Sequence, residues 1–529
     1  MGAGGWTLTI VLGVLALTIA HDLLQKRHAI LRNFPIIGHF RYWLEAIGPE
    51  LRQYIVTSNN EERPFSRDQR RWVYASAKKE NNYFAFGTDE AIELQPHYII
   101  IKHSAFAPEP ENGTPRVKGE PKRDFHPLNA EKLKGDYPIP CAKVLGAKRG
   151  RARAFRPSSA VNVSAMSYGS LSAAAIEALN RGVALADALH NTGEGGISPY
   201  HRNGGDLIWQ IGTGYFGCRG GDGGFSKTRF LETVDANRVK AIEIKLSQGA
   251  KPGLGGVLPA AKVTREIAGI RGVPVGQDVI SPSHHQAFAD VDEMLDFVEE
   301  LADSTGLPVG IKSAVGEDRV WLDLARLMSR GDRGVDFITI DGGEGGTGAA
   351  PLVFSDHVAL PFKIGFTRAF SIFAREGVAD DLVWIGSGKL GFPESALLAF
   401  SFGCDMIAVA REAMMAVGCI QAQRCHTGHC PTGVATQSKW LMRGLDSTSK
   451  AARLANYIVT LRKELLWLSR ACGERHPGLV TGDHIEIIDG VFGARSSWDV
   501  FGYEDGWGLP AREDQRSIRE IMASYEAPH

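Results

Sequence analysis

The feature that most constrains the fold is an alternation of short apolar, β-rich runs with helical stretches, which begins near residue 160. Several of the runs end in Gly, Ser or Asp, as strands that lead into loops do. Parallel strands buried on both faces and separated by helices favour an α/β fold closed into a (β/α)8 TIM barrel, with an open doubly wound sheet as the alternative. Eight runs are predicted as the strands: residues 161–166, 188–193, 241–247, 275–281, 308–314, 336–341, 382–387 and 406–410.

The chain of 529 residues is long enough for one such barrel with flanking segments. Its 59 basic and 60 acidic residues leave a net charge of −1, which gives no field that would recruit nucleic acid. Glycine is abundant, with 61 residues, and is concentrated between residues 190 and 350, as tight turns or close backbone approaches to a ligand would require. Active sites of barrels lie in the loops that follow the strands, so these loops are where we expect the chemistry.

The N-terminus predicts a membrane anchor. Residues 6–20 are apolar throughout, and the charge-free stretch from Met1 is about as long as a bilayer-spanning helix. Lys26, Arg27 and Arg32 follow it, so the positive-inside rule predicts a single-pass protein of the inner or plasma membrane with a cytoplasmic catalytic domain. A cleaved signal peptide and an apolar helix packed on the domain are the alternatives.

Four regions are predicted along the chain. Residues 1–28 form the transmembrane anchor, and residues 29–130 a membrane-proximal amphipathic and linker region. Within it, residues 29–56 suit either a helix in the membrane interface or one docked on the barrel, whereas residues 104–136 suit a loop or linker. Residues 131–475 form the barrel, and residues 476–529 a C-terminal wrap.

Three loops look suited to a phosphorylated cofactor. Residues 341–351 read DGGEGGTGAAP after one predicted strand, residues 386–391 read GSGKLG after the next, and Ala410-Arg411 opens a helix after the last. Phosphates commonly bind backbone N–H groups and a helix N-terminus at this place in barrels, which suits FMN. A tight turn is the alternative for any single loop. No G-x-G-x-x-G motif early in a βαβ unit indicates a nicotinamide-binding domain.

Lys312 lies inside an otherwise apolar predicted strand. A lysine is rarely buried there without a partner, and beside a reduced flavin it would stabilise negative charge. The alternative is a lysine at the strand rim that reaches solvent.

The cysteines contain the sharpest local pattern. Three of the seven follow the spacing Cys419-x5-Cys425-x4-Cys430, with His426 and His429 between them. Zinc sites usually have shorter Cys-x2-4-Cys gaps, and three thiolates on one irregular loop can hold three irons. Spacing alone leaves an iron–sulfur cluster and a Cys3His zinc site open.

With these residues in view, the chain resembles the FMN-binding synthase domain of glutamate synthases. The resemblance covers roughly residues 130–475, with every motif in family order. Its motifs are NVSAMSYGSLS (162–172), HNTGEGG (190–196), EIKLSQGAKPGLGG (243–256), ISPSHH (280–285), GEGGTGAAP (343–351) and the run 419–437.

The resemblance implies a [3Fe-4S] cluster on Cys419, Cys425 and Cys430. It matches Glu194 and Lys251 to the family's 2-oxoglutarate site, where a lysine can pair with a carboxylate and a glutamate can orient or protonate an imine. The expected FMN contacts, including those of the phosphate loops, are Met166, Ser167, Gly169, Gln248, Lys312, Gly345, Gly346, Thr347, Gly348, Gly388, Ala410 and Arg411.

Three departures from the family stand beside this likeness. No cysteine precedes Cys141, so a glutaminase domain with an N-terminal cysteine is not expected. Leu254 and Val257 replace a glutamate and a glutamine of the family's substrate loop, so the substrate need not be 2-oxoglutarate. The membrane segment is the third departure, and it suggests electron exchange with a membrane partner or a lipid-soluble compound.

The leading hypothesis is an FMN- and [3Fe-4S]-dependent oxidoreductase, acting on CH–NH2 donors, that reduces an imine of 2-oxoglutarate or a related 2-oxo acid to the amino acid. Its expected partners are this small molecule and an electron donor that is either ferredoxin-like or a membrane partner. Two alternatives remain. One is an FMN-dependent 2-hydroxy- or amino-acid dehydrogenase or an N-alkylglutamate-forming synthase. The other is a membrane-tethered electron-transfer subunit without catalysis of its own.

Overall fold

The structure is a computed structural model that describes residues 2–25, 28–56, 62–84, 86–88, 90–108, 136–491 and 493–526. The chain forms two compact units, residues 1–71 and 72–529. Lys26 and Arg27, on which the predicted membrane orientation partly rests, lie outside the described residues, as do residues 109–135 of the predicted linker.

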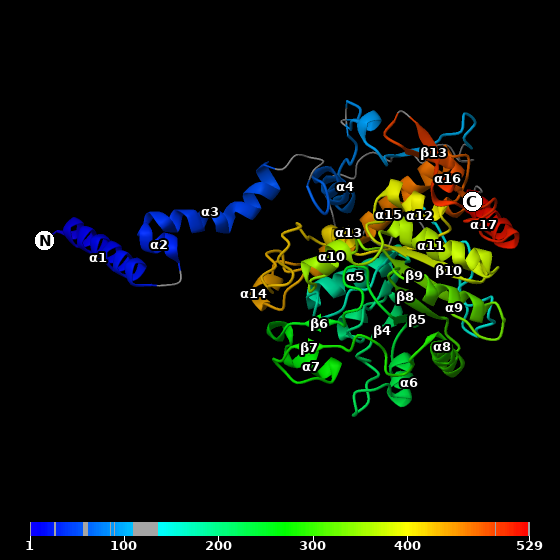
Figure 1. The fold of residues 1–529 in the computed structure, drawn as a ribbon, viewed down its shortest axis with the longest axis horizontal. Helices are drawn as coiled ribbons and strands as arrows, with labels where there is room; N and C mark the ends of the chain where they lie inside the picture. The colour runs from blue at the N-terminus through cyan, green and yellow to red at the C-terminus, as the bar shows by residue number, and fades with distance from the viewer. Residues whose placement is uncertain are drawn as a thin grey trace. The chain divides into compact units, whose positions relative to one another are not determined.

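The second unit contains a closed barrel of eight parallel strands (Figure 1). Pairing of Ile407 with Val161 joins the last strand to the first, so the barrel predicted from the sequence is confirmed and the open sheet is wrong. In chain order the strands are β2 (Val161–Val163), β3 (Leu189–Asn191), β4 (Asp206–Ile211), β5 (Val239–Lys245), β8 (Val309–Ser313), β9 (Phe337–Asp341), β10 (Val383–Ser387) and β11 (Met406–Val409).

One predicted barrel strand is wrong and another was missed. Residues 275–281 contribute only β7 (Val279–Ile280), which pairs with β6 (Val257–Leu258) in a separate two-stranded sheet. Asp278 accepts a hydrogen bond from the Ala260 N–H, which ties this polar segment to the loop after β5 rather than to the barrel. The missed strand is β4, because the connection from β3 holds a short 3-10 helix (Pro199–His201) and no α-helix. The alternation that marks the other strands is therefore absent there.

Helices surround the barrel, and polar side chains cap several of their N-termini. Ser172 accepts a hydrogen bond from the Ala175 N–H, and Asp446 accepts one from the Ser449 N–H. The helices that follow the strands are α5 (Ala173–Ala186), α6 (Lys227–Asp235), α7 (Arg265–Arg271), α8 (Val291–Thr305), α9 (Arg319–Met328), α10 (Leu352–His357), α11 (Phe362–Arg375), α12 (Pro393–Ser401), α13 (Arg411–Ala416), α14 (Lys439–Met442) and α15 (Ser447–Ala471). Gly182 allows α5 and α15 to pack closely, since a Cβ there would lie 2.7 Å from a Leu454 methyl carbon.

Segments from both ends of the second unit pack together. The strand β1 (Ile99–Ile101) pairs with β12 (Ile485–Ile488), which also pairs with β13 (Ala494–Ser496). The helices α16 (Ser497–Phe501) and α17 (Arg512–Glu526) follow. These contacts hold residues near 100 against the C-terminal part of the chain.

The first unit contains α1 (Ala3–Leu24), α2 (Ala29–Asn33), α3 (Ile37–Leu51), a π-helical turn (Arg52–Val56) and the start of α4 (Arg67–Lys78). Residues Gly4–Leu24 of α1 are long and apolar enough to cross a membrane, by length and composition alone. Because a signal sequence passes the same test, the membrane location remains a prediction.

Candidate active site

The parallel strands bring their C-terminal ends to one end of the barrel, where the polar side chains gather. Glu194 follows β3, Lys245 ends β5, Lys312 lies near the end of β8, and Asp341 ends β9. The loop after β5 adds Gln248 and Lys251. Strands far apart in the sequence thus supply a single cluster of charges.

Glu194 is held from several sides. The Lys245 ammonium lies 2.6 Å from its Oε1 and also donates to Gln248 Oε1 at 2.7 Å. Glycine is required on both flanks of the carboxylate, since a Cβ at Gly212 or at Gly256 would lie 2.7 Å from one of its oxygens. This close backbone approach fixes the position of the carboxylate.

Three cations surround this one carboxylate. Burial acts to raise the pKa of Glu194, but Lys245, Lys251 and Arg271 outweigh it and lower the pKa. Burial and the charge of Lys245 lower the pKa of Lys251, whose ammonium donates to the Gly255 carbonyl at 3.0 Å. Burial lowers the pKa of Arg271 to about 10. Glu194 is therefore ionised at neutral pH, and the surplus of positive charge suits a bound anion.

Lys312 is buried rather than at a solvent-exposed rim, with only 5% of its surface exposed. Burial acts to lower its pKa, but Asp341 and Glu243 raise it above the usual value, so the lysine is charged. Its ammonium lies 3.4 Å from Asp341 Oδ2, which also accepts a hydrogen bond from the Gly249 N–H at 3.0 Å. The pair links β8, β9 and the loop after β5.

Glu243 forms a hydrogen-bonded layer inside the barrel. Its two carboxylate oxygens accept hydrogen bonds from Asn191 at 2.7 Å, Gln210 at 2.6 Å and Thr339 at 2.7 Å. The four side chains come from β3, β4, β5 and β9. Because every partner is buried and satisfied, this layer gives the charged cluster a rigid support.

The predicted phosphate loops lie together. Gly388, after β10, has a φ of +128°, and a Cβ there would lie 3.3 Å from the Gly342 Cα in the loop after β9. A Cβ on Gly346 would lie 2.6 Å from Arg411 Cδ, and the Arg411 guanidinium donates to the Glu344 carbonyl. Glycine-lined loops beside a guanidinium fit a phosphate. The other predicted contacts in these loops are Gly345, Thr347, Gly348 and Ala410, the residue before α13.

The predicted turn of Met166, Ser167 and Gly169 lies against the loop of Glu194. A Cβ on Gly193 would lie 2.7 Å from the Ser167 N, so only glycine permits this approach. Arg271 donates to the Tyr168 carbonyl at 3.1 Å, and a Cβ on Gly169 would lie 3.1 Å from the same guanidinium. The turn therefore joins the charged cluster on its β2 side.

The structure places the three cysteines on one loop after α13. Cys425 and Cys430 lie near enough for their charges to interact, and Lys262 donates to the Cys425 carbonyl at 2.7 Å. The Cys419 carbonyl accepts a hydrogen bond from the Tyr74 hydroxyl at 2.9 Å. The donor chemistry suits a cluster, but no three His, Cys, Asp or Glu side chains in the described part of the chain are arranged to hold a metal. The metal ligands stay a prediction.

Residues outside the predicted set also contribute to this end of the barrel. Lys245 had a signal in the sequence, because it lies two positions after Glu243 in one strand and so faces the same side. His285 donates from Nε2 to the Lys245 carbonyl at 2.9 Å. Arg271 ends α7, about 75 residues from Glu194, and has no local signal in the sequence. Asp341 opens a glycine-rich loop, and nothing else in the sequence indicates that it pairs with Lys312.

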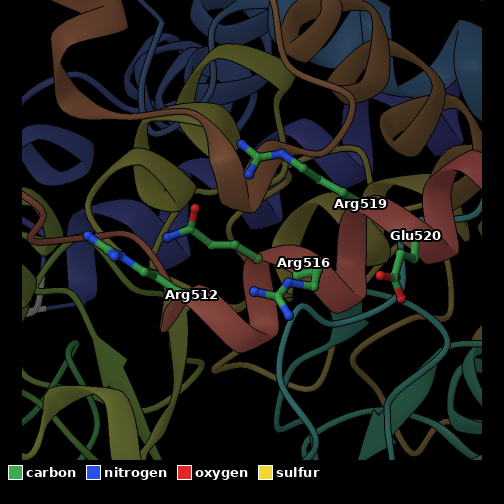
Figure 2. A pocket seen from close by; sticks show the side chains of 5 residues that line it. Arg512, Arg516, Arg519 and Glu520 are labelled. Atoms are coloured by element: carbon green, nitrogen blue, oxygen red, sulfur yellow. The ribbon is translucent and has the colours of Figure 1, made fainter.

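A surface pocket of about 440 Å³ lies elsewhere, along α17 (Figure 2). It is lined by Arg512, Gln515, Arg516, Arg519 and Glu520, all on this one helix. No strand-end loop contributes to its lining, so it is separate from the charged cluster.

A closed parallel barrel with buried charges and glycine-lined loops at its strand ends has the architecture of a barrel enzyme. Residues 138–475 match the model of a family described as the conserved region in glutamate synthase. The chain therefore belongs to the glutamate synthase family.

Named relatives agree. Glutamate synthase large subunit-like protein YerD of Bacillus subtilis is 38% identical and covers 90% of this chain and 94% of its own length. The archaeal glutamate synthase [NADPH] of Methanocaldococcus jannaschii is 34% identical over 59% of each chain. The glutamate synthase [NADPH] large chain of B. subtilis is 30% identical over 58% of this chain but only 20% of its own. The match thus spans about three fifths of the archaeal relative and one fifth of the large chain.

Solved structures give a weaker likeness. A mandelate oxidase mutant with an FMN adduct has a TM-score of 0.38 at 15% identity, over 61% of this chain and 78% of that one. A flavocytochrome b2 with sulfite bound has a TM-score of 0.40 at 13% identity, over 89% and 90%. The assignment of the barrel depends on the strand pairing alone.

Proposed function

We propose that the chain is an FMN-dependent oxidoreductase of glutamate-synthase type that reduces the imine of a 2-oxo acid to the amino acid. One observation carries the proposal: three buried cations surround the ionised Glu194 beside glycine-lined loops at the strand ends. A 2-oxo acid brings the carboxylate that this surplus of positive charge would bind. The nitrogen of its protonated imine is cationic and would donate a hydrogen bond to the Glu194 carboxylate.

Residues of two groups would hold the cofactor. The loops with Gly346 and Gly388, together with Arg411, offer the phosphate-binding surface, and the Met166–Gly169 turn and Gln248 lie toward the substrate side. Lys312, charged and buried, would stabilise negative charge at the flavin ring. When bound and reduced, FMN supplies the hydride.

The charged cluster would position the substrate. Lys251 and Arg271 would bind its carboxylate, and Lys245 would keep Glu194 in place. The Glu194 carboxylate would accept hydrogen bonds from the protonated imine nitrogen, which stabilises the iminium. Held in this way, the iminium carbon would take up a hydride and become the carbon of the amine, with FMN as the hydride source and an external donor as the source of the electrons.

The proposal extends to the cysteine loop and the membrane. Cys419, Cys425 and Cys430 are proposed as ligands of a [3Fe-4S] cluster, in keeping with the family resemblance. The length and composition of α1 support a membrane anchor, and the basic residues after it support a cytoplasmic catalytic domain. The electron donor is then a ferredoxin-like protein or a membrane partner.

The test is a reoxidation assay on the purified full chain. The protein is reduced without oxygen, and flavin absorbance is followed after mixing with ammonium and a panel of 2-oxo acids that carry acidic or apolar side chains. We expect reoxidation with formation of the amino acid in at least one case. The proposal is wrong if the protein binds no flavin, or if flavin is bound and no 2-oxo acid with ammonium reoxidises it.

The same panel separates the alternatives. Reduction of the oxidised flavin by 2-hydroxy or amino acids would indicate a dehydrogenase, and product formation only with an alkylamine would indicate an N-alkylglutamate-forming synthase. A protein that exchanges electrons normally after Glu194→Gln substitution would be an electron-transfer subunit.

A further inference from the structure

The helix α3 exposes a continuous apolar face. Positions 37, 40, 44, 47 and 51 recur at intervals of three and four residues, so their side chains share one side of the helix. Ile37 is 76% exposed and Phe40 is 60% exposed. Leu44, Leu51 and the neighbouring Trp43 are also exposed. Such a face is rarely left to water.

A charged stripe runs along α3 beside its apolar face. Arg41 and Glu45 lie one turn apart and form an ion pair of 2.5 Å, and both side chains are about half exposed. Arg52, directly after the helix, falls on the same side. An apolar face with Phe40 and the neighbouring Trp43, flanked by charged side chains, is the pattern of a helix lying in a membrane interface.

A buried carboxylate fixes α3 to the end of α1. Asp22, in the last turn of α1, accepts hydrogen bonds from the Ile36 N–H at 3.1 Å and from His39 Nε2 at 2.9 Å. Ile36 has a φ of +65°, which is costly for a β-branched residue and indicates a bend that its surroundings impose. Gly38 permits the close packing inside the bend, because a Cβ there would lie 3.0 Å from Leu31 Cδ2.

We infer that α3 is a second membrane contact, which lies in the lipid–water interface with its apolar face among the acyl chains. The occupant is a bilayer with anionic headgroups. The Asp22 contacts hold the start of α3 against the end of the predicted span, at the depth of the headgroups, and Arg32 supplies positive charge there. The inference rests on the proposed anchoring by α1.

Site-directed labelling of the full chain tests this inference. Phe40→Cys and Leu44→Cys place a polarity-sensitive fluorophore on the apolar face. Glu45→Cys and Ala46→Cys are matched controls at exposed positions of the same turns that lie away from the apolar face. Leu12→Cys reports on α1, and the unsubstituted chain gives the labelling background. Each protein is placed in phosphatidylcholine vesicles with and without phosphatidylglycerol, and lipids carrying a quencher at shallow or deep positions are then included.

We expect labels at 40 and 44 to emit at shorter wavelength and to lose fluorescence to the shallow quencher, more strongly with phosphatidylglycerol, while labels at 45 and 46 stay aqueous. Equal behaviour of the two faces would overturn the inference. Apolar-face labels protected from both water and lipid quenchers would also overturn it, because α3 would then pack on protein. Cross-linking between copies through residue 44 would identify that protein as a second chain. If the label at 12 also escapes the deep quencher, the proposed anchor itself fails.

Discussion

The two sides of the barrel's C-terminal end differ in the groups that they expose. On the side of β9, β10 and β11, glycines such as Gly346 and Gly388 expose the backbone beside Arg411. On the side of β3 and β5 it is charged side chains, with Lys245, Lys251 and Arg271 around Glu194. Exposed backbone N–H groups suit the phosphate of a cofactor, which is the same for every substrate. The substrate preference of a charged cluster, in contrast, can be changed by single side-chain substitutions. Cofactor binding and substrate choice should therefore respond to different mutations.

The largest expected effect lies on the charged side. Glu194→Gln removes the one negative charge among three cations, so the protonated imine loses its acceptor. We expect turnover to fall by about 100-fold or more, with FMN content unchanged. Stopped-flow reoxidation and flavin absorbance measure the two quantities.

Asp336→Asn is the matched control for this prediction, because Asp336 is a buried carboxylate whose Oδ2 lies 3.0 Å from Arg151 Nε, at the start of β9 and thus at the opposite end of the barrel. It should lower stability without a selective loss of turnover. Turnover that survives Glu194→Gln would contradict the assigned role.

The next effect tests the backbone side. Gly388→Val introduces a β-branched residue at a φ of +128° and a Cβ 3.3 Å from the Gly342 Cα. Strain of about 1–3 kcal/mol would weaken FMN binding roughly fivefold to 150-fold. Titration of the apoprotein with FMN measures the affinity.

Gly377→Val is the control for strain alone, since Gly377 has a φ of +74° after α11 and open space around its Cβ position. It should lower Tm but leave FMN affinity unchanged. If both variants bind FMN as tightly as the unsubstituted chain, the glycine-lined loops do not form the cofactor site.

The same contrast explains what the sequence could predict. Within each loop after β9 and β10 the glycines lie close together, directly after an apolar run, so the sequence pattern identifies both loops. Ala410-Arg411 after β11 is identified as the start of a helix. Glu194 and Lys251 came from the family resemblance. Arg271 reaches the cluster only through the fold of α7 against the β2 turn, which no local pattern encodes.

The fold shows the same limit. Seven of the eight barrel strands were predicted because a helix or a long insertion separates each from the next. The strand β4 follows β3 with only a 3-10 helix between them, so its apolar run was not recognised. Residues 275–281 resemble a barrel strand because a short β-rich run that ends in Ser looks alike in any sheet. Only the pairing of Val257 with Ile280 places β7 in a separate sheet.

A smaller effect is expected for substrate choice. Val257 adjoins Gly256, whose Cβ position lies 2.7 Å from Glu194 Oε1, and its side chain is partly exposed. Val257→Gln would offer a hydrogen bond to a second carboxylate, so the preference for 2-oxoglutarate over an apolar 2-oxo acid should rise about tenfold. Ratios of kcat/KM measure the preference.

Ile280→Gln is the control for this substitution, because Ile280 faces Val257 across the two-stranded sheet. It adds the same group without adjoining Gly256. An equal shift in both variants would show that the preference reflects the polarity of the sheet surface and not a contact made by residue 257.

The smallest expected effect is on the pH dependence of stability, through His285, which contacts the Lys245 backbone in the charged cluster. Burial lowers the pKa of His285 to about 4, below that of an exposed histidine, near 6.5. Neutral His285 donates from Nε2 to the Lys245 carbonyl, and its Nδ1 lies 3.2 Å from the Tyr215 hydroxyl. Since two backbone N–H groups donate to that hydroxyl, it donates in turn to Nδ1. Protonation of Nδ1 would break this bond.

The unfolded chain binds more protons at this histidine between pH 6.5 and 4, so stability falls as the pH falls through that window. The loss from pH 7 to pH 6 should stay below about 1 kcal/mol for this group. His285→Gln keeps a donor and an acceptor without titrating, so the decline in Tm on acidification should become shallower. It should not vanish, because burial also lowers the pKa of His190 to about 3 and of His476 to about 4. His103→Gln, at an exposed histidine, is the control for the substitution itself. A slope in His285→Gln equal to that of the unsubstituted chain would contradict the prediction.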